Sequence, residues 1–474
     1  MTVVNWDDEK EEGHSAPGQS KGLEAGLAPV AVGDEDEEED EAAGVLQMPV
    51  FYMRAVFLWP EGLSAMQRFL ARYVFPLFNT QIVLGGLAFI VLEEHPNFMP
   101  PLTTAGDCMA ASVLIAKLIV LRRAGPRLVE MRRQLQYGFK MFESQAEPEA
   151  SRVNARCVSR CRTISRRFAW LYLPLSVSAA LLLIFNAFAP ADQRHIIANA
   201  PRALLICPYT YWPLFVCNMG GIVTFLFFSA GYDTLFLSLC LHLSCKCEIL
   251  RVLLRRAGKH HGLALQKEAG DGGAHDQVKK NYEFEHWNDD GTAFDANSHA
   301  GSRREMDDHL RSCVRYHHMV IRLRDETERI FSGVSLFQML YVLLALCIPA
   351  LRLLHEKTIS AVDVVFILLY FAWNFSQLLF YCWFADVLAE ASEEVSVAAY
   401  AALRPPAVDG AALGLDSPVC SLGRAGGATL RLITLRAQRP LHLTAGRITN
   451  LTLVLYLEII RRSQSIFSYL IRLR

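Results

Sequence analysis

Residues with metal-binding side chains are clustered at three places in the sequence. Cys240, Cys245 and Cys247 share one short stretch, and adjacent histidines stand at 260–261 and at 317–318. A zinc site needs further cysteine, histidine or carboxylate ligands at a fixed spacing, and none accompanies these residues. The pattern therefore favours reduced thiols and histidines on a polar face. It predicts neither a metal site nor a cofactor.

The motifs of common enzyme classes are missing. The sequence has no Walker loop, nucleophile elbow, HExxH motif, dinucleotide fingerprint or spaced carboxylate pair. The acidic run at 33–44 repels itself and predicts a solvated, disordered tail, with weak binding of calcium or of a basic partner as the alternative. We therefore expect a protein that is not an enzyme and has no nucleic-acid partner.

Apolar residues are gathered in blocks, although the chain has a formal net charge of −1 and a mean hydropathy of +0.21. One membrane crossing needs about 20 mostly apolar residues. Seven blocks meet this requirement and predict an all-α protein with seven transmembrane helices. The second is weaker, because its Asp107 and Lys117 either reach outward or face the protein interior. The last is the least lipid-like, because several charged and polar residues fall in its middle. The blocks are 74–92, 104–121, 168–189, 213–243, 330–351, 361–389 and 448–471.

Lys and Arg residues indicate the orientation, because they are concentrated in the cytoplasmic loops of membrane proteins. They are abundant in 122–167, 245–329 and 390–447 but sparse in 93–103, 190–212 and 352–360. This distribution predicts a cytoplasmic N-terminus and an extracellular C-terminus. A metabotropic seven-helix receptor has the opposite orientation, and its signature motifs after the third helix and in the seventh are absent.

The chain divides into five segments. We expect a disordered acidic cytoplasmic tail at 1–50 and a flexible cytoplasmic loop at 261–305. Residues 51–260 hold helices one to four with cytoplasmic extensions, and 306–430 hold a cytoplasmic helix with helices five and six. Residues 431–474 hold an anchor helix and helix seven. Helical spacing after residue 247 and from residue 306 predicts that two helices continue well into the cytoplasm.

Three stretches near the C-terminus resemble the signature of insect odorant receptors: "FYCWFADVLAEASEEVSVAAY" at 380–400, "LRAQRPLHLTAG" at 435–446 and "SIFSYLIRLR" at 465–474. The matching residues are Tyr381, Cys382, Phe384, Ser392, Ala399, Tyr400, Arg436, Ala437, Gln438, Pro440, Leu443, Thr444, Ala445 and Gly446. Ala385 stands where the family usually has Gly, and the segment after Tyr400 departs from the family pattern. The ending differs from that of gustatory receptors, the alternative class of ligand-gated channel, and from that of the family co-receptor.

The resemblance implies an odorant-gated, non-selective cation channel in the cell membrane of olfactory sensory neuron dendrites. Four subunits would surround one pore lined by the seventh helices, and a ligand-tuned subunit would assemble with the co-receptor. The polar run at 435–449 would be the cytoplasmic start of one continuous element, bent at the membrane. The anchor residues implied are Arg436, Gln438, Pro440, Thr444 and Gly446.

The last helix keeps polar residues that a lipid-facing helix would not need, so we expect it to border water. By the resemblance, Tyr469 and Leu473 match gate positions; ordinary packing is the alternative. Arg461 and Arg462 either line the inner vestibule or pair with Glu458. The pore and gate candidates are Arg461, Gln464, Ser465, Tyr469 and Leu473.

Volatile odorants offer little beyond shape and dispersion, so their pocket needs apolar and aromatic walls. The resemblance implies a pocket in the outer half of the bundle. Packing in the core is the alternative role for each candidate. The candidates are Leu182 and Phe185 on the third helix, Val216 and Met219 on the fourth, and Tyr370 and Trp373 on the sixth.

Overall fold

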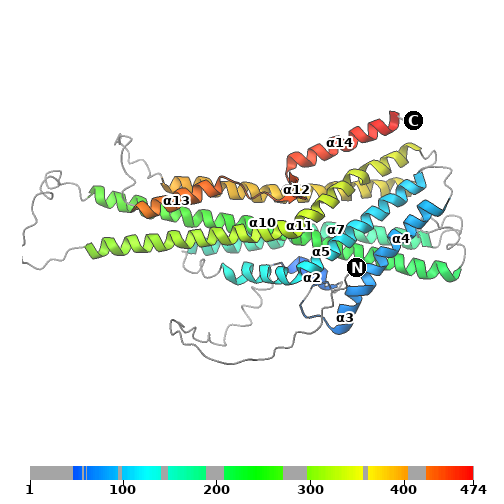
Figure 1. The fold of residues 1–474 in the computed structure, drawn as a ribbon, viewed down its shortest axis with the longest axis horizontal. Coiled ribbons are helices and arrows are strands. Elements are labelled where there is room, and N and C mark those ends of the chain that lie inside the picture. The colour runs from blue at the N-terminus through cyan, green and yellow to red at the C-terminus, as the bar shows by residue number, and fades with distance from the viewer. Residues whose placement is uncertain are drawn as a thin grey trace, which may run out of the picture. The chain divides into compact units, whose positions relative to one another are not determined.

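The computed structural model describes residues 46–55, 58–59, 61–93, 99–139, 148–187, 208–270, 296–355, 361–403 and 423–472. Of residues 172–187 it describes only the backbone. Most of the acidic tail and of the loops predicted at 261–305 and after Tyr400 lies outside these ranges. The described part is almost entirely helical (Figure 1).

The N-terminal helices are α2 (Gln47–Ala55), α3 (Ala65–Phe69) and α4 (Phe75–Leu92), with the π-helical turn η1 (Leu70–Val74) joining the last two. They are followed by α5 (Met99–Arg133), which ends in the π-helical turn η2 (Gln134–Gly138), and by α7 (Pro148–Ala187). The long helices are α10 (Pro208–Gly270), α11 (Ala296–His355) and α12 (Ala361–Leu403). The chain then forms α13 (Gly423–Ala437), the strands β1 (Thr444–Ala445) and β2 (Thr449–Asn450), and α14 (Leu453–Arg472).

Five helical stretches are long and apolar enough to cross a membrane: Ala65–Leu92, Pro101–Gly138, Tyr209–Ala257, Met306–Ile348 and Ile367–Leu403. They contain the predicted helices one, two and four and most of five and six, which agrees with a helical membrane fold. The predicted third helix falls in the second half of α7, and the predicted seventh in α14. The count of seven and the orientation of the termini stay predictions.

Three helices extend far beyond a membrane. α10 has 63 residues and α11 has 60, so at 1.5 Å per residue they are about 95 and 90 Å long, against a hydrocarbon core of about 30 Å. α12, with 43 residues, packs along α10. α10 and α11 are thus helical well past their apolar blocks, and the cytoplasmic location of these extensions stays a prediction. They reach into the range of the predicted 261–305 loop, because α10 continues to Gly270 and α11 begins at Ala296.

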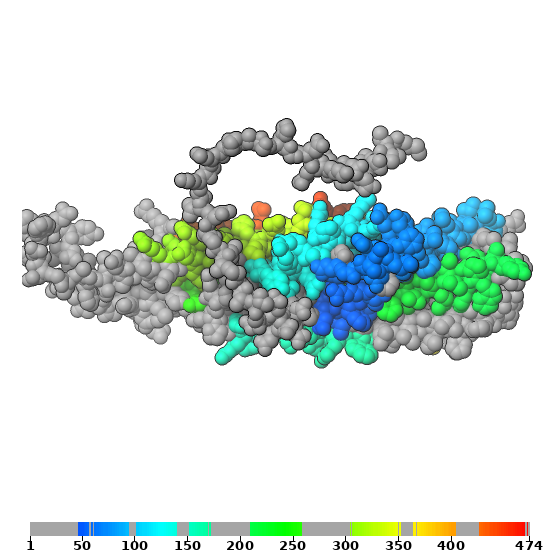
Figure 2. All heavy atoms as spheres, turned by 90° about the horizontal axis from the view of Figure 1, so that it is seen from below, coloured from blue at the N-terminus to red at the C-terminus, as the bar shows by residue number. Residues whose placement is uncertain are grey.

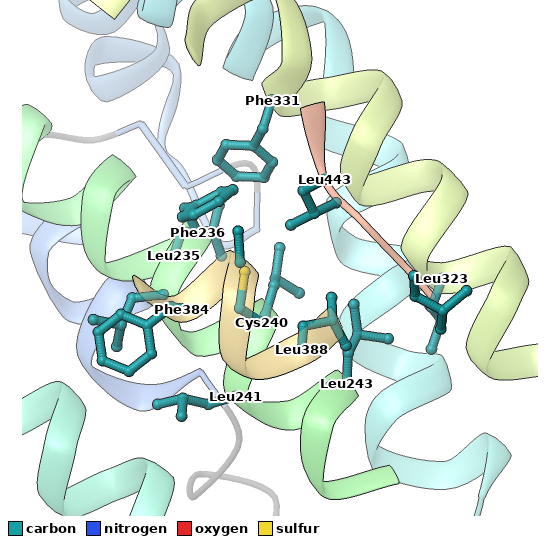
Figure 3. Packing of buried hydrophobic residues seen from close by; sticks show 14 of the residues in the cluster. Leu235, Phe236, Cys240, Leu241, Leu243, Leu323, Phe331, Phe384, Leu388 and Leu443 are labelled. Carbon is teal, nitrogen blue, oxygen red and sulfur yellow. The ribbon is translucent and has the colours of Figure 1, made fainter. Parts of the chain in front are cut away.

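A single hydrophobic cluster runs through most of the described helices, and Figure 3 shows part of it between α10, α11 and α12. The ring of Phe236 on α10 stacks on Tyr381 of α12 at 4.5 Å and contacts Phe331 of α11 at 5.2 Å. Fully burying an aliphatic or aromatic side chain of this size contributes about 1.5–3 kcal/mol. Leu443, from the segment before α14, enters the same core, which ties the C-terminal region to the bundle.

The N-terminal helices cover one side of α10. On the face seen in Figure 2, α2, α3 and α4 lie beside α5 and α10. Gly220 lets α4 come close to α10, because a Cβ at this position would lie 2.6 Å from the ring of Phe78. Close backbone approach of this kind is a common way to pack membrane helices.

The prediction of one continuous element from residue 435 into the last helix is wrong. α13 ends at Ala437 and α14 begins at Leu453, and between them Thr444–Ala445 and Thr449–Asn450 pair in a short antiparallel hairpin. Gly446 and Arg447 both have positive φ, +62° and +60°, and the N–H of Ile448 donates to the carbonyl of Ala445 at 3.1 Å. Two central residues with positive φ define a type I′ turn. Pro440 and Gly446 therefore lie in a break between two helices, where a bend within one helix was expected.

Candidate functional site

A buried cluster of polar side chains surrounds Asp233 of α10. Its carboxylate lies 2.8 Å from the ammonium of Lys117 on α5, and the two side chains are only 1% and 2% exposed. The carboxylate also accepts hydrogen bonds from Ser229 at 3.2 Å, from Gln377 at 2.5 Å and from Tyr381 at 2.6 Å. These five residues are called the Asp233 cluster.

The Asp233 cluster connects four helices. Ser229 and Asp233 come from α10, Lys117 from α5, and Gln377 and Tyr381 from α12. The amide of Gln338 on α11 donates to the side-chain oxygen of Gln377 at 2.9 Å, which brings in the fourth helix. A buried ion pair persists only when further hydrogen bonds offset the cost of desolvating its charges. The helices are therefore held in the register that these bonds require.

A small cavity adjoins the cluster. Its volume is about 10 Å³, which is space for one water molecule. A ligand pocket usually has a volume of roughly 300 Å³ or more, so binding of an odorant here would require the helices to separate. The lining residues are Ala110, Val113, Leu114, Lys117, Phe225, Ser229, Gln338, Tyr341 and Gln377.

Tyr370 is the predicted pocket residue that lies nearest to this cavity. Its hydroxyl forms a 2.8 Å hydrogen bond with the hydroxyl of Tyr341, which lines the cavity. Trp373 is buried one helical turn further along α12. Met219 is half-buried, and Val216 is 61% exposed on the surface of this chain. The side chains of Leu182 and Phe185 lie outside the described residues.

The sequence analysis missed most of the cluster. For Lys117, the sequence left an outward and an inward orientation open, and in the structure its side chain is buried in the bundle. Asp233 stands inside the 213–243 block, and an ionisable residue within an apolar helix is by itself an indication of function. Gln338 and Gln377 gave a similar but weaker indication inside the fifth and sixth blocks. Their mutual contacts could not be read from the sequence, because Lys117 and Asp233 are 116 positions apart.

α14 lies on one side of the bundle, where it contacts α11 and α12 (Figure 1). The face of α14 toward the bundle contains the buried Ile459 and Ser463. The thiol of Cys347 on α11 donates a weak hydrogen bond to the carbonyl of Ser463 at 3.6 Å. Glu458 and Arg462 form an ion pair at 3.6 Å, one of the two arrangements that the sequence left open. Four of the pore candidates are exposed, and Leu473 lies outside the described residues. The four are Arg461, Gln464, Ser465 and Tyr469.

The hairpin before α14 is bonded to the long helices. The N–H of Thr444 donates to the carboxylate of Glu328 on α11 at 2.8 Å, and the N–H of Gly446 donates to the carbonyl of Ser332 at 2.7 Å. On α12, Ser392 accepts a 2.8 Å bond from the N–H of Leu441. These bonds attach the segment that leads into α14 to both α11 and α12.

The predicted anchor residues differ in their surroundings. Thr444 and Gly446 lie in the bonded hairpin, and Pro440 is half-buried just before it. Arg436 and Gln438, at the end of α13, are exposed. The hairpin thus contains the anchor residues that contact the rest of the chain most closely.

The three clustered cysteines lie buried along α10. The sulfur of Cys245 is 3.7 Å from that of Cys161 on α7. Within the part of the chain that the structure describes, no group of three or more Cys, His, Asp or Glu residues is arranged to hold a metal ion.

The five helices that are long and apolar enough to cross a membrane are typical of a helical membrane protein. The chain belongs to the 7tm odorant receptor family, whose sequence model matches residues 101–402. This family consists of receptors, so the protein is not an enzyme. The match contains the first of the three signature stretches and ends before α13 and α14.

Solved structures share the fold. The olfactory receptor OR5 from the insect Machilis hrabei in complex with eugenol matches with a TM-score of 0.63 and 13% sequence identity, covering 93% of this chain and 100% of the other. A second structure of the same receptor matches with a TM-score of 0.61, again at 13% identity and with the same coverage. No curated protein sequence matches the chain.

Proposed function

We propose that this protein is a ligand-tuned odorant receptor subunit that opens a non-selective cation pore, in a heterotetramer with the family co-receptor. The observation that carries the proposal is α14. It is the last helix of an odorant receptor fold, and it exposes both apolar and charged side chains that its own chain does not cover. Neighbouring subunits on one side and water on the other would satisfy both kinds of surface.

The odorant site of this proposal is the cavity beside the Asp233 cluster, enlarged toward Tyr370 and Trp373. The walls near Phe225, Val113 and Leu114 are apolar, as a volatile ligand requires. The hydroxyls of Tyr341 and Tyr370 are directional groups that an odorant would meet, beside the polar lining residues Ser229, Gln338 and Gln377. Eugenol, the ligand named for the OR5 structure, carries a phenol that such hydroxyls can bind, so it belongs in a first panel of volatiles.

Gating follows from the way the hairpin is attached. An odorant that occupies the enlarged cavity favours a wider spacing of α11 and α12. Both helices are bonded to the hairpin, so the start of α14 moves with them and the pore widens. The ligand shifts the population of states only by its difference in affinity between the closed and the open arrangement.

The proposal includes an orientation and a location. The N-terminus would be cytoplasmic and the C-terminus extracellular, in the dendritic membrane of olfactory sensory neurons. The long ends of α10, α11 and α12 would then form a cytoplasmic anchor that joins the subunits, and Tyr469 with Leu473 would lie at the gate near the outer mouth.

Recording of odorant-evoked currents tests the proposal. The chain is expressed with the co-receptor and exposed to a panel of volatiles, including eugenol. We expect cation currents that need both subunits, and Tyr469→Ala should change the leak current or the conductance. Tyr209→Ala, at a position that is 90% exposed on α10, is the control and should change neither. Surface-expressed chain that gives no current with any volatile, or Tyr469→Ala currents identical to wild type, would reject the channel or the gate assignment respectively.

A further inference from the structure

The cytoplasmic half of α7 carries an unusual concentration of positive charge. Residues 150–187 contain arginines but no Asp, Glu or Lys. All of these arginines are exposed, and they are called the arginine face. The face consists of Arg152, Arg156, Arg160, Arg162, Arg166 and Arg167.

The arginine face lies opposite the surface by which α7 packs against α10. The packed surface holds Cys161, which contacts Cys245, and Ser165, whose hydroxyl lies 2.9 Å from that of Ser238. At 100° per residue, the arginines fall about 100° to 260° around the helix from Cys161. They therefore point away from the bundle.

No ion pair within the described residues neutralises this face. Exposed arginines elsewhere do have such partners: Arg133 pairs with Glu130 at 3.0 Å, Arg311 with Asp308 at 3.3 Å and Arg329 with Glu326 at 2.8 Å. The arginine face thus concentrates charge that the described chain does not compensate. A ligand for it must supply several negative charges.

The level of the membrane surface is marked by Trp170. It is 64% exposed, directly follows the arginines and begins the apolar half of α7 together with Leu171. Tryptophan is enriched where the hydrocarbon meets the lipid headgroups. At 1.5 Å per residue, Arg167, Arg166 and Arg162 lie about 4.5, 6 and 12 Å from Trp170 along the axis. They are therefore at the depth of the headgroups or just below it.

We propose that the arginine face binds anionic phospholipid headgroups of the cytoplasmic leaflet. Guanidinium groups bind phosphate oxygens through paired hydrogen bonds, and clusters of basic residues just cytoplasmic of a membrane helix recognise anionic lipids. The topology rule requires basic residues in this loop but does not require them to share one outward face next to an exposed tryptophan. The leaflet named here rests on the orientation proposed above.

Lipid binding can be measured in micelles of a neutral detergent. A micelle has no cytoplasmic or outer leaflet, so the result does not depend on the proposed orientation of the chain. The purified full-length chain is titrated with fluorescent phosphatidylserine, and with fluorescent phosphatidylcholine as the neutral lipid. The variant Arg162→Gln/Arg166→Gln/Arg167→Gln is compared with the control Arg133→Gln/Arg311→Gln/Arg329→Gln, which removes the same charge from exposed, paired arginines. The same three α7 positions changed to Lys keep the charge, and thermal stability verifies that each variant is folded.

We expect the glutamine variant of α7 to bind phosphatidylserine about 10- to 100-fold more weakly, while the control and the lysine variant stay near wild type. High salt should weaken wild-type binding. Equal affinities of the α7 variant and the control, or equal binding of both lipids by the wild type, would overturn the proposal. So would a polyglutamate peptide that binds more tightly than phosphatidylserine, because the face would then serve an acidic protein. None of these outcomes bears on channel activity, which the current recordings test separately.

Discussion

The Asp233 cluster and α14 both place charged side chains among apolar ones, but the charges are buried in the cluster and exposed on α14. In the cluster, Lys117 and Asp233 are almost fully buried and every partner comes from the same chain. On α14, Glu458 and Arg462 pair loosely, with 50% and 74% of their side chains exposed. Nearby Val454 and Leu457 are exposed as well.

The charges of the Asp233 cluster are paired within this chain, whereas the exposed surface of α14 is available for contact with other molecules. The polar side chains of the Asp233 cluster have their partners on α5, α10, α11 and α12. α14 is attached through a hairpin and one face, and none of the described residues covers its remaining surface. In our account the bundle therefore senses the ligand and α14 forms the interface with water and with other subunits.

The largest expected effect comes from removing one charge of the buried pair. Asp233→Leu leaves the Lys117 ammonium without its counter-charge and should lower the free energy of unfolding by about 3–5 kcal/mol. The thermal midpoint of the purified protein, measured by loss of the monodisperse chromatographic peak on heating, should fall sharply. The double variant Lys117→Met/Asp233→Leu should recover much of the loss. A double variant as unstable as the single one would show that the hydrogen bonds, not the charges, dominate.

A smaller but still large effect is expected in the hairpin. Gly446→Ala places a methyl group 2.6 Å from Leu336 at a residue with φ of +62°, and should destabilise the hairpin by about 2–4 kcal/mol. Odorant-evoked current should fall at unchanged surface expression. Gly62→Ala is the matched control, because Gly62 also has positive φ, +75°, but nothing lies within 4 Å of the added methyl. Equal currents in the two variants would mean that the hairpin does not transmit opening.

An intermediate effect is expected where the two regions communicate. Tyr341→Phe removes the hydroxyl pair that joins α11 to α12, a bond of about 1 kcal/mol. Since this bond favours the closed cavity, odorants without a hydrogen-bonding group, which lose no contact with the hydroxyl, should act at about threefold to tenfold lower concentration. Dose–response curves of the current measure the shift. Tyr209→Phe should leave the curve in place, and an unchanged curve for Tyr341→Phe would remove the tyrosine pair from the gating mechanism.

The smallest effect is expected for the ion pair on α14. Arg462→Gln should change the thermal midpoint very little, because an exposed pair contributes about 0–1 kcal/mol. Comparison of its thermal midpoint with that of Asp233→Leu tests the difference between the exposed pair on α14 and the buried pair of the Asp233 cluster. A loss of stability as large as that of Asp233→Leu would mean that Arg462 is buried in the assembly.

Much of this fold could be predicted from patterns of neighbouring residues in the sequence. Apolar blocks of sufficient length predicted the membrane helices, and helical spacing after residue 247 and from residue 306 predicted the extensions of α10 and α11. Tyr381 and Cys382, in the family signature, indicated the odorant receptor family, and the family match confirms it. Each of these features depends on residues that are close together in the chain.

Features that depend on distant contacts were not predictable in the same way. The partner of Lys117, Asp233, lies on another helix. Each charge lowers the mean hydropathy of its own apolar block, but nothing in the sequence indicates that the two charges meet. The hairpin depends on positive φ at Arg447, a residue type that rarely adopts it, so "AGRIT" gave no clear turn signal. Val216 matched the composition of a pocket wall, yet in this chain it faces outward.

The exposure of α14 to water is the central claim, and accessibility of substituted cysteines tests it most directly. Gln464→Cys and Tyr469→Cys lie on the exposed face, and Ser463→Cys, at a position that is 6% exposed against the bundle, is the control. With the assembled channel in cells, we predict that an aqueous methanethiosulfonate reagent changes the odorant-evoked current of the first two variants and not of the third or of the wild type. If Gln464→Cys and Tyr469→Cys were both insensitive, with and without odorant, α14 would not border the pore.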